Sequence, residues 1–295
     1  MGERFEIKAA DGYGLAGTRF SPDGQAKAVV VIPGAMGVRQ DYYFGFARYL
    51  AEQGYAALTF DYRGTGLSAP ASLRGFRATA TEWAEKDYNA ALHAAKHWLP
   101  ERPLLVAGHS LGGQLPGLVP DNHLIDAMIT VATGSGYWRE NTPQLKRVVW
   151  WLWYFVVPVT LPTVGYFPGK RLRMVGDLPK GVMAEWARWC RSPHYICDER
   201  GRPIRAGFQR IRFPILSLSF TDDEMMSETN TIRMHACYDQ ASVELRRIAP
   251  EQIGAKRIGH FGFFRSEFQD SLWHQAVAWF DGQLAAAAAQ DTVAS

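Results

Sequence analysis

Residues 104–113, with the sequence LLVAGHSLGG, constrain the fold of this chain more than any other stretch. Four apolar residues with strand character lead into G-H-S-L-G (108–112), and a segment with helix-start character follows. The pattern G-x-S-x-G in this setting predicts a strand, a sharp turn that carries Ser110, and a helix. Glycine on both sides of the serine leaves room for a tight crossing. The Leu111 amide would then lie at a helix N-terminus, where it can stabilise a developing negative charge.

The motif needs support from the rest of the chain, because a glycine-rich turn with a buried serine gives the same pattern. That support begins with the rhythm of strands and helices. Short apolar runs alternate with helical patterns at 41–53 and 81–99, and a last helix is expected from Ser266, with Gln269 completing a capping box. This alternation predicts an α/β fold with a mostly parallel sheet. The expected strands are 4–9, 15–20, 28–32, 55–60, 104–107, 127–132, 211–219 and 242–248.

Two polar or glycine-rich loops follow strands of this predicted sheet. The loop Pro33-Gly-Ala-Met-Gly37 comes directly after a buried strand, and its backbone amides can face a ligand. We expect the Ala35 amide to be a second donor to an oxyanion, with an ordinary strand-to-helix turn as the alternative. The loop at 61–68 contains Asp61, Arg63, two glycines and a serine, and its composition favours a structural role over direct catalysis.

The alternation is lost between residues 136 and 210, where six of the ten tryptophans fall. Such a shift between two strands predicts a helical cap inserted after the sixth strand, with a core formed by 1–135 and 211–295. The apolar stretch 148–167 lies inside this insertion, flanked by basic residues. Pro158, Pro162 and Gly165 interrupt it, so we expect a cap that walls an apolar pocket rather than a membrane span. A weak contact of the cap with a membrane surface remains an alternative.

Candidate catalytic groups follow the later strands. Asp222, Asp223 and Glu224 come just after the strand at 211–219, where parallel sheets keep their chemistry. A polar turn or a helix cap would explain one of these acids but less readily all three. His260 stands in a loop flanked by Gly259 and Gly262 and is free to point into a cleft, although a structural histidine is possible there.

The chain order of Ser110, the pair Asp222/Asp223 and His260 resembles that of the α/β-hydrolase superfamily. In particular the chain is similar to capped bacterial serine hydrolases of the serine-aminopeptidase type. The resemblance implies that Ser110 is the nucleophile and His260 the base, with oxyanion donors at Leu111 and Ala35. It implies Asp223 as the acid, with Asp222 as the alternative. Two positions depart from the family pattern, since Pro33 replaces a common histidine and Phe220 a common glycine.

This resemblance implies acyl transfer through an acyl-serine, a reaction that needs no cofactor and no metal. The aromatic cap favours a small-molecule carboxylic ester or thioester with an apolar group as substrate. Peptidase and acyltransferase activities use the same three residues and stay open. So does a binding or membrane-associating protein on a hydrolase scaffold that turns nothing over.

The composition of the chain limits which partners and which cellular location are expected for the protein. The net charge is only +3 and no basic block stands out, which argues against nucleic acid. The three cysteines, at 190, 197 and 237, lack metal-type spacing and are odd in number. Together with an N-terminus that has no apolar signal region, they predict a reduced, cytoplasmic protein. The sequence leaves the oligomeric state open.

Overall fold

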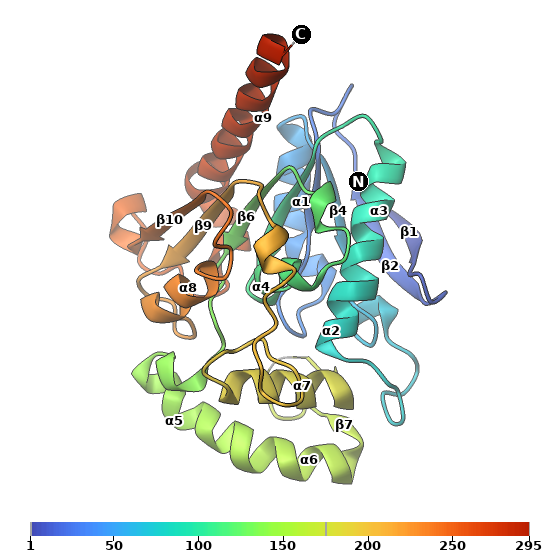
Figure 1. Cartoon of the computed structure of the whole chain (residues 1–295), viewed down its shortest axis with the longest axis vertical. Helices are drawn as coiled ribbons and strands as arrows, with labels where there is room; N and C mark the ends of the chain where they lie inside the picture. Colours follow the sequence, from blue (N-terminus) through green and yellow to red (C-terminus); the bar gives the residue numbers. More distant parts are fainter. Residues whose placement is uncertain (1, 175, 295) are drawn as a thin grey trace.

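The computed structural model describes residues 2–174 and 176–294, and its centre is an eight-stranded sheet (Figure 1). The strand order is β1-β2-β4-β3-β5-β6-β9-β10. β1 pairs antiparallel with β2 and β2 pairs antiparallel with β4, whereas all the remaining pairs are parallel. The strands are β1 (Glu3–Lys8), β2 (Gly14–Phe20), β3 (Val29–Ile32), β4 (Ala56–Phe60), β5 (Leu104–His109), β6 (Ala127–Val131), β9 (Ile215–Phe220) and β10 (Val243–Ile248). The mostly parallel sheet predicted from the sequence is confirmed.

Both faces of the sheet are covered, which explains why the central strands are apolar throughout. Alternate residues of β3 separate the two layers: Val29 and Val31 belong to one hydrophobic cluster, Val30 and Ile32 to the other. The second cluster joins the sheet to α1 (Phe44–Glu52) and α9 (His274–Ala294). The first joins it to α2 (Ala80–Glu82), α3 (Asn89–Trp98), α4 (Leu111–Gln114) and α8 (Glu228–His235).

Some helix boundaries differ from the predictions. The helix expected at 81–99 is α2, a π-helical segment (Trp83–Tyr88) and α3 in succession. The last helix does not begin with the predicted capping box, because Ser266 opens a 3-10 turn and a π-helical segment (Gln269–Trp273) precedes α9. Capping boxes of the expected kind occur instead at Thr79, before α2, and at Ser227, before α8.

Between β6 and β9 the chain forms α5 (Pro143–Trp151), a π-helical segment (Leu152–Val156), α6 (Val157–Val164) and α7 (Lys180–Arg191). A two-stranded sheet of β7 (Tyr166–Phe167) and β8 (Leu178–Pro179) completes the segment. These helices gather at one end of the molecule, opposite the tip of α9 (Figure 1).

The expected break at Pro158 and Pro162 is absent, and residues 143–164 form one continuous helical stretch. The wider π-helical turn directly before α6 accommodates Pro158, which has no amide hydrogen to donate. By length and composition this stretch could cross a membrane, and 28% of its most apolar window is buried in the protein.

The loop at 61–68 is held by charges, as its composition predicts. Asp61 accepts hydrogen bonds from the amides of Gln40 and Leu67. The Arg63 guanidinium binds Asp87 at 2.7 Å and Asp11 at 2.6 Å, and the Arg63 and Asp87 side chains are 5% and 0% exposed. The pair therefore joins this loop, inside the protein, to the π-helical segment between α2 and α3.

Replacing Asp87 by alanine would leave the Arg63 charge buried with only its partly exposed partner. We expect Asp87→Ala to lower the free energy of unfolding by about 3–5 kcal/mol, measured by urea denaturation. The control is Asp41→Ala, which removes an exposed pair with Arg39 (side chains 49% and 57% exposed) and should cost less than about 1 kcal/mol. Equal losses in the two variants would contradict this assignment.

Candidate functional site

Ser110 occupies the turn between β5 and α4, and its backbone is strained. The torsion angles are φ 49° and ψ −107°, a conformation that side-chain-bearing residues rarely adopt. The flanking glycines are required by contact: a Cβ on Gly108 would lie 2.7 Å from the Gly113 nitrogen, and one on Gly112 only 2.1 Å from the Pro33 carbonyl oxygen. The turn thus has the shape that the sequence predicts, and Ser110 remains 8% exposed.

Asp223 and His260 form a buried pair at the same edge of the sheet. His260 Nδ1 lies 2.9 Å from Asp223 Oδ2 and 3.1 Å from Oδ1, with both side chains nearly inaccessible. The Met225 and Met226 amides also donate to Asp223 Oδ1, at 2.7 and 2.9 Å. These two donors hold the carboxylate in place, so that it fixes the orientation of the His260 ring.

The neighbouring acids bind the loop of His260 rather than its ring. Asp222 accepts hydrogen bonds from the Ile258 amide at 2.8 Å and the Gly259 amide at 3.1 Å. Glu224 accepts one from the His260 amide at 3.1 Å. All three acids of the run therefore have a partner in 258–260, and of these three only Asp223 is hydrogen-bonded to the imidazole.

His260 is joined to the serine turn through His109, the residue before Ser110. His109 Nε2 lies 3.0 Å from the His260 carbonyl oxygen, and the two ring centres are 5.4 Å apart. On its other side, His109 Nδ1 lies 2.9 Å from Tyr43 Oη, which also accepts a hydrogen bond from the Ala35 amide at 2.8 Å. The serine turn, the His260 loop and the loop at 33–37 are thus connected by buried hydrogen bonds.

The direction of these hydrogen bonds follows from the partners. Burial lowers the pKa of His109 to about 3, so the ring is neutral near pH 7. A carbonyl only accepts, so Nε2 carries the proton toward His260 and Nδ1 accepts from the Tyr43 hydroxyl. Burial also raises the pKa of Tyr43, which keeps this hydroxyl protonated. The chain therefore runs from Ala35 N–H through Tyr43 O–H to His109, and separately from His109 N–H to His260.

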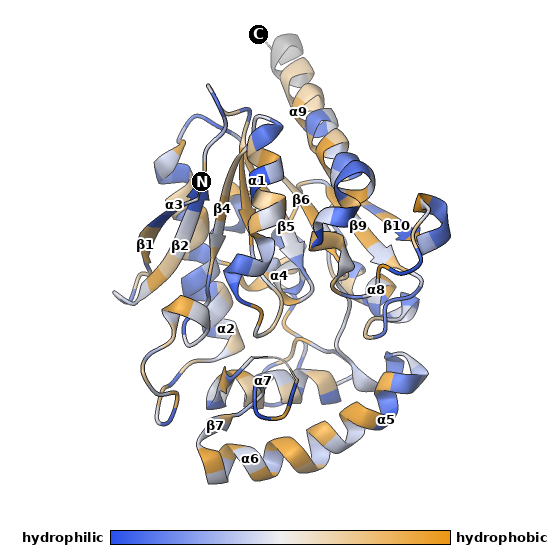
Figure 2. Cartoon of the chain, turned by 180° about the vertical axis from the view of Figure 1, so that it is seen from behind, coloured by the Kyte–Doolittle hydropathy of each residue, from blue (hydrophilic) through white to orange (hydrophobic). Residues whose placement is uncertain are grey.

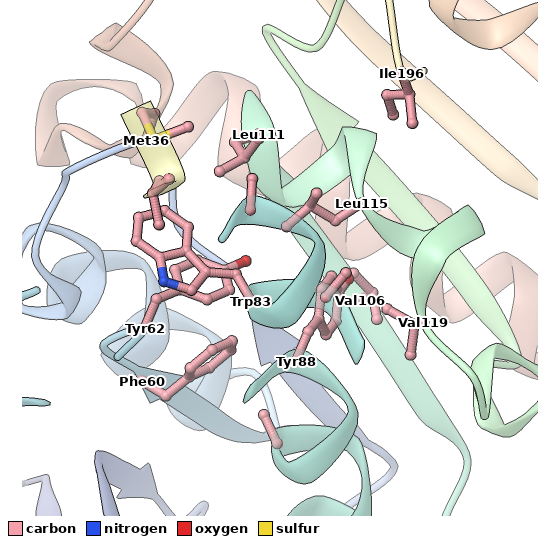
Figure 3. Close-up of a cluster of buried hydrophobic side chains, with 14 of the residues drawn as sticks. Met36, Phe60, Tyr62, Trp83, Tyr88, Val106, Leu111, Leu115, Val119 and Ile196 are labelled. Atoms are coloured by element: carbon pink, nitrogen blue, oxygen red, sulfur yellow. The ribbon is translucent and has the colours of Figure 1, made fainter. Parts of the chain in front are cut away.

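This arrangement corrects the role expected for Ala35. Its amide hydrogen is directed at Tyr43 Oη and is not free to bind an oxyanion. In the described part of the chain, neither the Leu111 amide nor the next loop amide, that of Met36, has a hydrogen-bond acceptor. Met36 and Leu111 belong to one hydrophobic cluster with Tyr62 and Trp83, which Figure 3 shows from one side.

A cavity of about 550 Å³ lies next to these residues. Its lining includes Phe261, which follows His260, and Met225, which lies two residues after Asp223. Gly37 and Tyr42 line it from the core, and Arg173, Met174 and Gly176 from the segment between β7 and β8. The cavity therefore lies between loops that follow strands of the sheet and the segment between β7 and β8, and its lining is mainly apolar.

Sequence reasoning proposed Ser110, His260 and Asp223 as the catalytic residues but missed the side chains that connect their loops. The histidine of G-H-S was visible as part of the motif, and its position before Ser110 was the available signal. Tyr43 carried no signal of its own, because a tyrosine in an amphipathic helix start is usually a packing residue. Its role depends on a contact between residues 66 positions apart.

Serine turns of this shape at the C-terminal edge of a mostly parallel sheet define the α/β hydrolases. The family described as "Serine aminopeptidase, S33" matches residues 24–174, which is just over half of the 295-residue chain. The chain belongs to this family of hydrolases, and the predicted superfamily is confirmed.

Solved structures with the same fold cover nearly the whole chain. A soluble variant of monoglyceride lipase from Saccharomyces cerevisiae aligns with a TM-score of 0.66 at 15% identity, over 96% of this chain and 94% of its own. A carboxyl esterase from Bacillus coagulans gives 0.63 at 14% identity, over 96% and 99%. An esterase from Pyrococcus furiosus gives 0.62 at 14% identity, over 95% and 91%. At these identities the similarity establishes the α/β-hydrolase fold.

The connection through Tyr43 can be tested by Tyr43→Phe. We expect the free energy of unfolding to fall by about 1–3 kcal/mol, because the Ala35 amide and His109 Nδ1 lose a buried partner. We also expect kcat on a p-nitrophenyl ester to fall about tenfold with little change in KM, because His109 no longer fixes the serine turn and the His260 loop together.

The matched control is Tyr13→Phe, which removes a 2.5 Å hydrogen bond to the Ser68 carbonyl away from these loops. It should cost stability and leave kcat unchanged. An unchanged kcat in Tyr43→Phe would show that the contact serves packing alone.

Because two histidines are buried, we expect the free energy of unfolding to fall toward acid pH. Burial lowers the pKa of His109 to about 3 and that of His235 to about 4, below the ordinary value near 6.5. Between these values the unfolded chain binds more protons, so the free energy of unfolding falls as the pH drops from 7 toward 4. Each histidine contributes up to about 1.4 kcal/mol per pH unit.

His235 is the one to replace, because its contacts are with Thr130 and the Thr231 carbonyl rather than with the site. Urea denaturation at several pH values should show a shallower pH dependence in His235→Gln. His97→Gln, at an exposed position of α3, serves as the control. A wild-type slope in His235→Gln would contradict the assignment.

Proposed function

We propose that this protein hydrolyses a small-molecule carboxylic ester or thioester with an apolar group, using Ser110, His260 and Asp223. The observation that carries the proposal is the buried hydrogen bond between His260 Nδ1 and Asp223, beside a serine on a strained turn. That bond leaves His260 Nε2 as the nitrogen able to take a proton. Family membership supports hydrolysis as the type of reaction.

The reaction proceeds in two halves. His260 Nε2 takes the proton of the Ser110 hydroxyl as its oxygen attacks the substrate carbonyl, and Asp223 stabilises the resulting imidazolium. When the tetrahedral intermediate collapses, the bond to the alcohol or thiol breaks and that group leaves with the proton from His260. A water molecule, deprotonated by His260, then attacks the acyl-serine. The bond between the acyl carbon and the Ser110 oxygen breaks, that oxygen takes the proton back from His260, and the acid is released. The mechanism uses no cofactor or metal.

The negative charge on the carbonyl oxygen needs amide donors, each of which is worth about 3 kcal/mol in related sites. The Leu111 amide, at the start of α4 and without a protein acceptor in the described residues, is the first. For the second we propose the Met36 amide in place of Ala35, because the Ala35 amide is bonded to Tyr43. Both residues pack on the same hydrophobic cluster, which supports a common site.

The cavity beside the site favours an ester over a peptide substrate with a free amino terminus. An aminopeptidase needs a negatively charged group to bind the substrate ammonium. The lining instead contains apolar side chains and one cation, Arg173, with no aspartate or glutamate among the residues that define it. An apolar acyl or alcohol group fits this lining, and a cationic amino terminus does not.

We further propose that residues 136–210 act as a cap, of which Arg173, Met174 and Gly176 line the substrate cavity. The position of α5, α6 and α7 between β6 and β9 in the chain supports this division. A cytoplasmic location also remains a proposal, supported by three cysteines that are all free thiols.

Hydrolysis of p-nitrophenyl esters of increasing acyl length, together with labelling by a fluorophosphonate, tests the proposal. Wild-type protein should turn over and be labelled on Ser110, whereas Ser110→Ala should do neither. Asp223→Asn should lower kcat about 10³-fold or more, because the His260 ring loses its orientation. A wild-type protein that neither turns over nor is labelled would favour a binding protein on this scaffold.

Asp222→Asn is the matched variant, since it removes the neighbouring carboxylate that contacts only the Ile258 and Gly259 amides. We expect a much smaller loss of kcat than in Asp223→Asn. A loss confined to Asp222→Asn would reverse the assignment of the acid. Product analysis in the presence of an alcohol would reveal an acyltransferase, because the acyl group would then appear on the alcohol.

A further inference from the structure

The helical stretch at 143–164 exposes large apolar side chains along one side. Two rows with spacings of three or four residues, 148-151-155-159 and 150-154, place them on one side of a helix. Each is between 40% and 60% exposed, although apolar residues of this size are ordinarily buried. We call this set the aromatic face: Val148, Trp150, Trp151, Tyr154, Phe155 and Val159.

The aromatic face is not needed to hold the helix on the protein. The opposite side of the same stretch is buried in the main hydrophobic cluster through Val149, Leu152, Trp153, Val157 and Leu161. Neighbouring rings of the aromatic face pack on one another, as Trp151 and Phe155 do with centres 4.6 Å apart. Figure 2 shows α5 and α6 as the outermost helices at their end of the molecule. The face is therefore a continuous apolar surface turned outward.

Positive charge is concentrated in the segment of the chain that carries this surface. Residues 139–174 contain six basic residues and one acidic residue, a formal charge of +5 in a chain whose total is +3. The rest of the chain therefore carries −2. The one acid, Glu140, is already paired with Arg233 at 2.9 Å. The basic residues are Arg139, Lys146, Arg147, Lys170, Arg171 and Arg173.

We propose that the aromatic face docks on an anionic lipid bilayer, with the helix lying parallel to the surface. Tryptophan and tyrosine favour the membrane interface, and nearby lysine and arginine attract acidic headgroups. A spanning orientation would remove Trp153 and Leu152 from the core of the protein. It would also put the basic residues before and after the helix on opposite sides of the bilayer, whereas a parallel helix brings both groups to one surface.

A second copy of the chain fits this surface less well. In a symmetric dimer the same patch meets itself, so the basic residues around one aromatic face would approach those around the other. The uncompensated +5 charge of the segment would then be doubled at the interface. An anionic membrane neutralises that charge and covers the apolar side chains at the same time.

The test uses full-length Ser110→Ala protein, so that binding is measured without turnover. Co-sedimentation compares vesicles of phosphatidylcholine with vesicles containing 30% phosphatidylglycerol. We expect at least tenfold more binding to the anionic vesicles, reversed by high salt, and at least a tenfold loss in Trp151→Ser/Phe155→Ser. Protein that stays with the vesicles after both high salt and carbonate extraction would indicate a spanning helix and overturn the proposal.

The matched control is Ile232→Ser/Leu245→Ser, which removes two equally exposed apolar side chains elsewhere on the protein. It should bind vesicles as the parent does, and circular dichroism checks that both double variants are folded. Light scattering after size exclusion reports the oligomeric state. No binding to either vesicle, binding that survives Trp151→Ser/Phe155→Ser, or a parent dimer that this variant converts to monomer would each overturn the proposal.

Discussion

The strained backbone at Ser110 is the constraint on which the rest of the site depends. A conformation of this kind costs about 1–3 kcal/mol and persists only where neighbouring structure holds it. Here the Ser110 amide donates to the Val131 carbonyl at 2.9 Å, and the Ser110 carbonyl accepts from Gly113 and from the Thr133 hydroxyl. The turn is thereby held by β6 on one side and by α4 on the other. The parallel sheet therefore supplies the rigidity that keeps the serine hydroxyl out of regular secondary structure.

The loop of His260 is held in place by carboxylates, whereas the serine turn is held by the sheet. Three consecutive acids after β9 face amides or the imidazole of residues 258–260. Carboxylates are strong acceptors for backbone amides, so this run fixes an irregular loop that has no ladder of its own. Asp222 and Glu224 bind backbone amides of this loop, whereas Asp223 binds the His260 ring. That division explains why a run of three acids occurs where a catalytic site needs one.

Sequence patterns with a local cause were predicted well. The eight strands of the sheet and the shape of the Ser110 turn follow from apolar runs and from glycines that leave no room for a Cβ. The choice between Asp222 and Asp223 needed coordinates, because adjacent residues differ only in the direction of their side chains. The bond between Ala35 and Tyr43 also needed them, since it joins a loop to a later helix turn. The effect of Pro158 was misjudged because a π-helical turn absorbed it.

The helices between β6 and β9 are also part of the core, and this limits how a substrate can enter. Val182, Met183 and Trp189 of α7 are fully buried in the same cluster as Leu111 and Trp83. Exposing each such side chain costs about 1.5–3 kcal/mol, and Glu185 adds two hydrogen bonds to Thr81 at the start of α2. Lifting the helices as a body would therefore cost more than a small ligand recovers. A ligand can reach the cavity bounded by Arg173 and Met174 without any displacement of these helices. Entry past these two residues is the route that leaves the core intact.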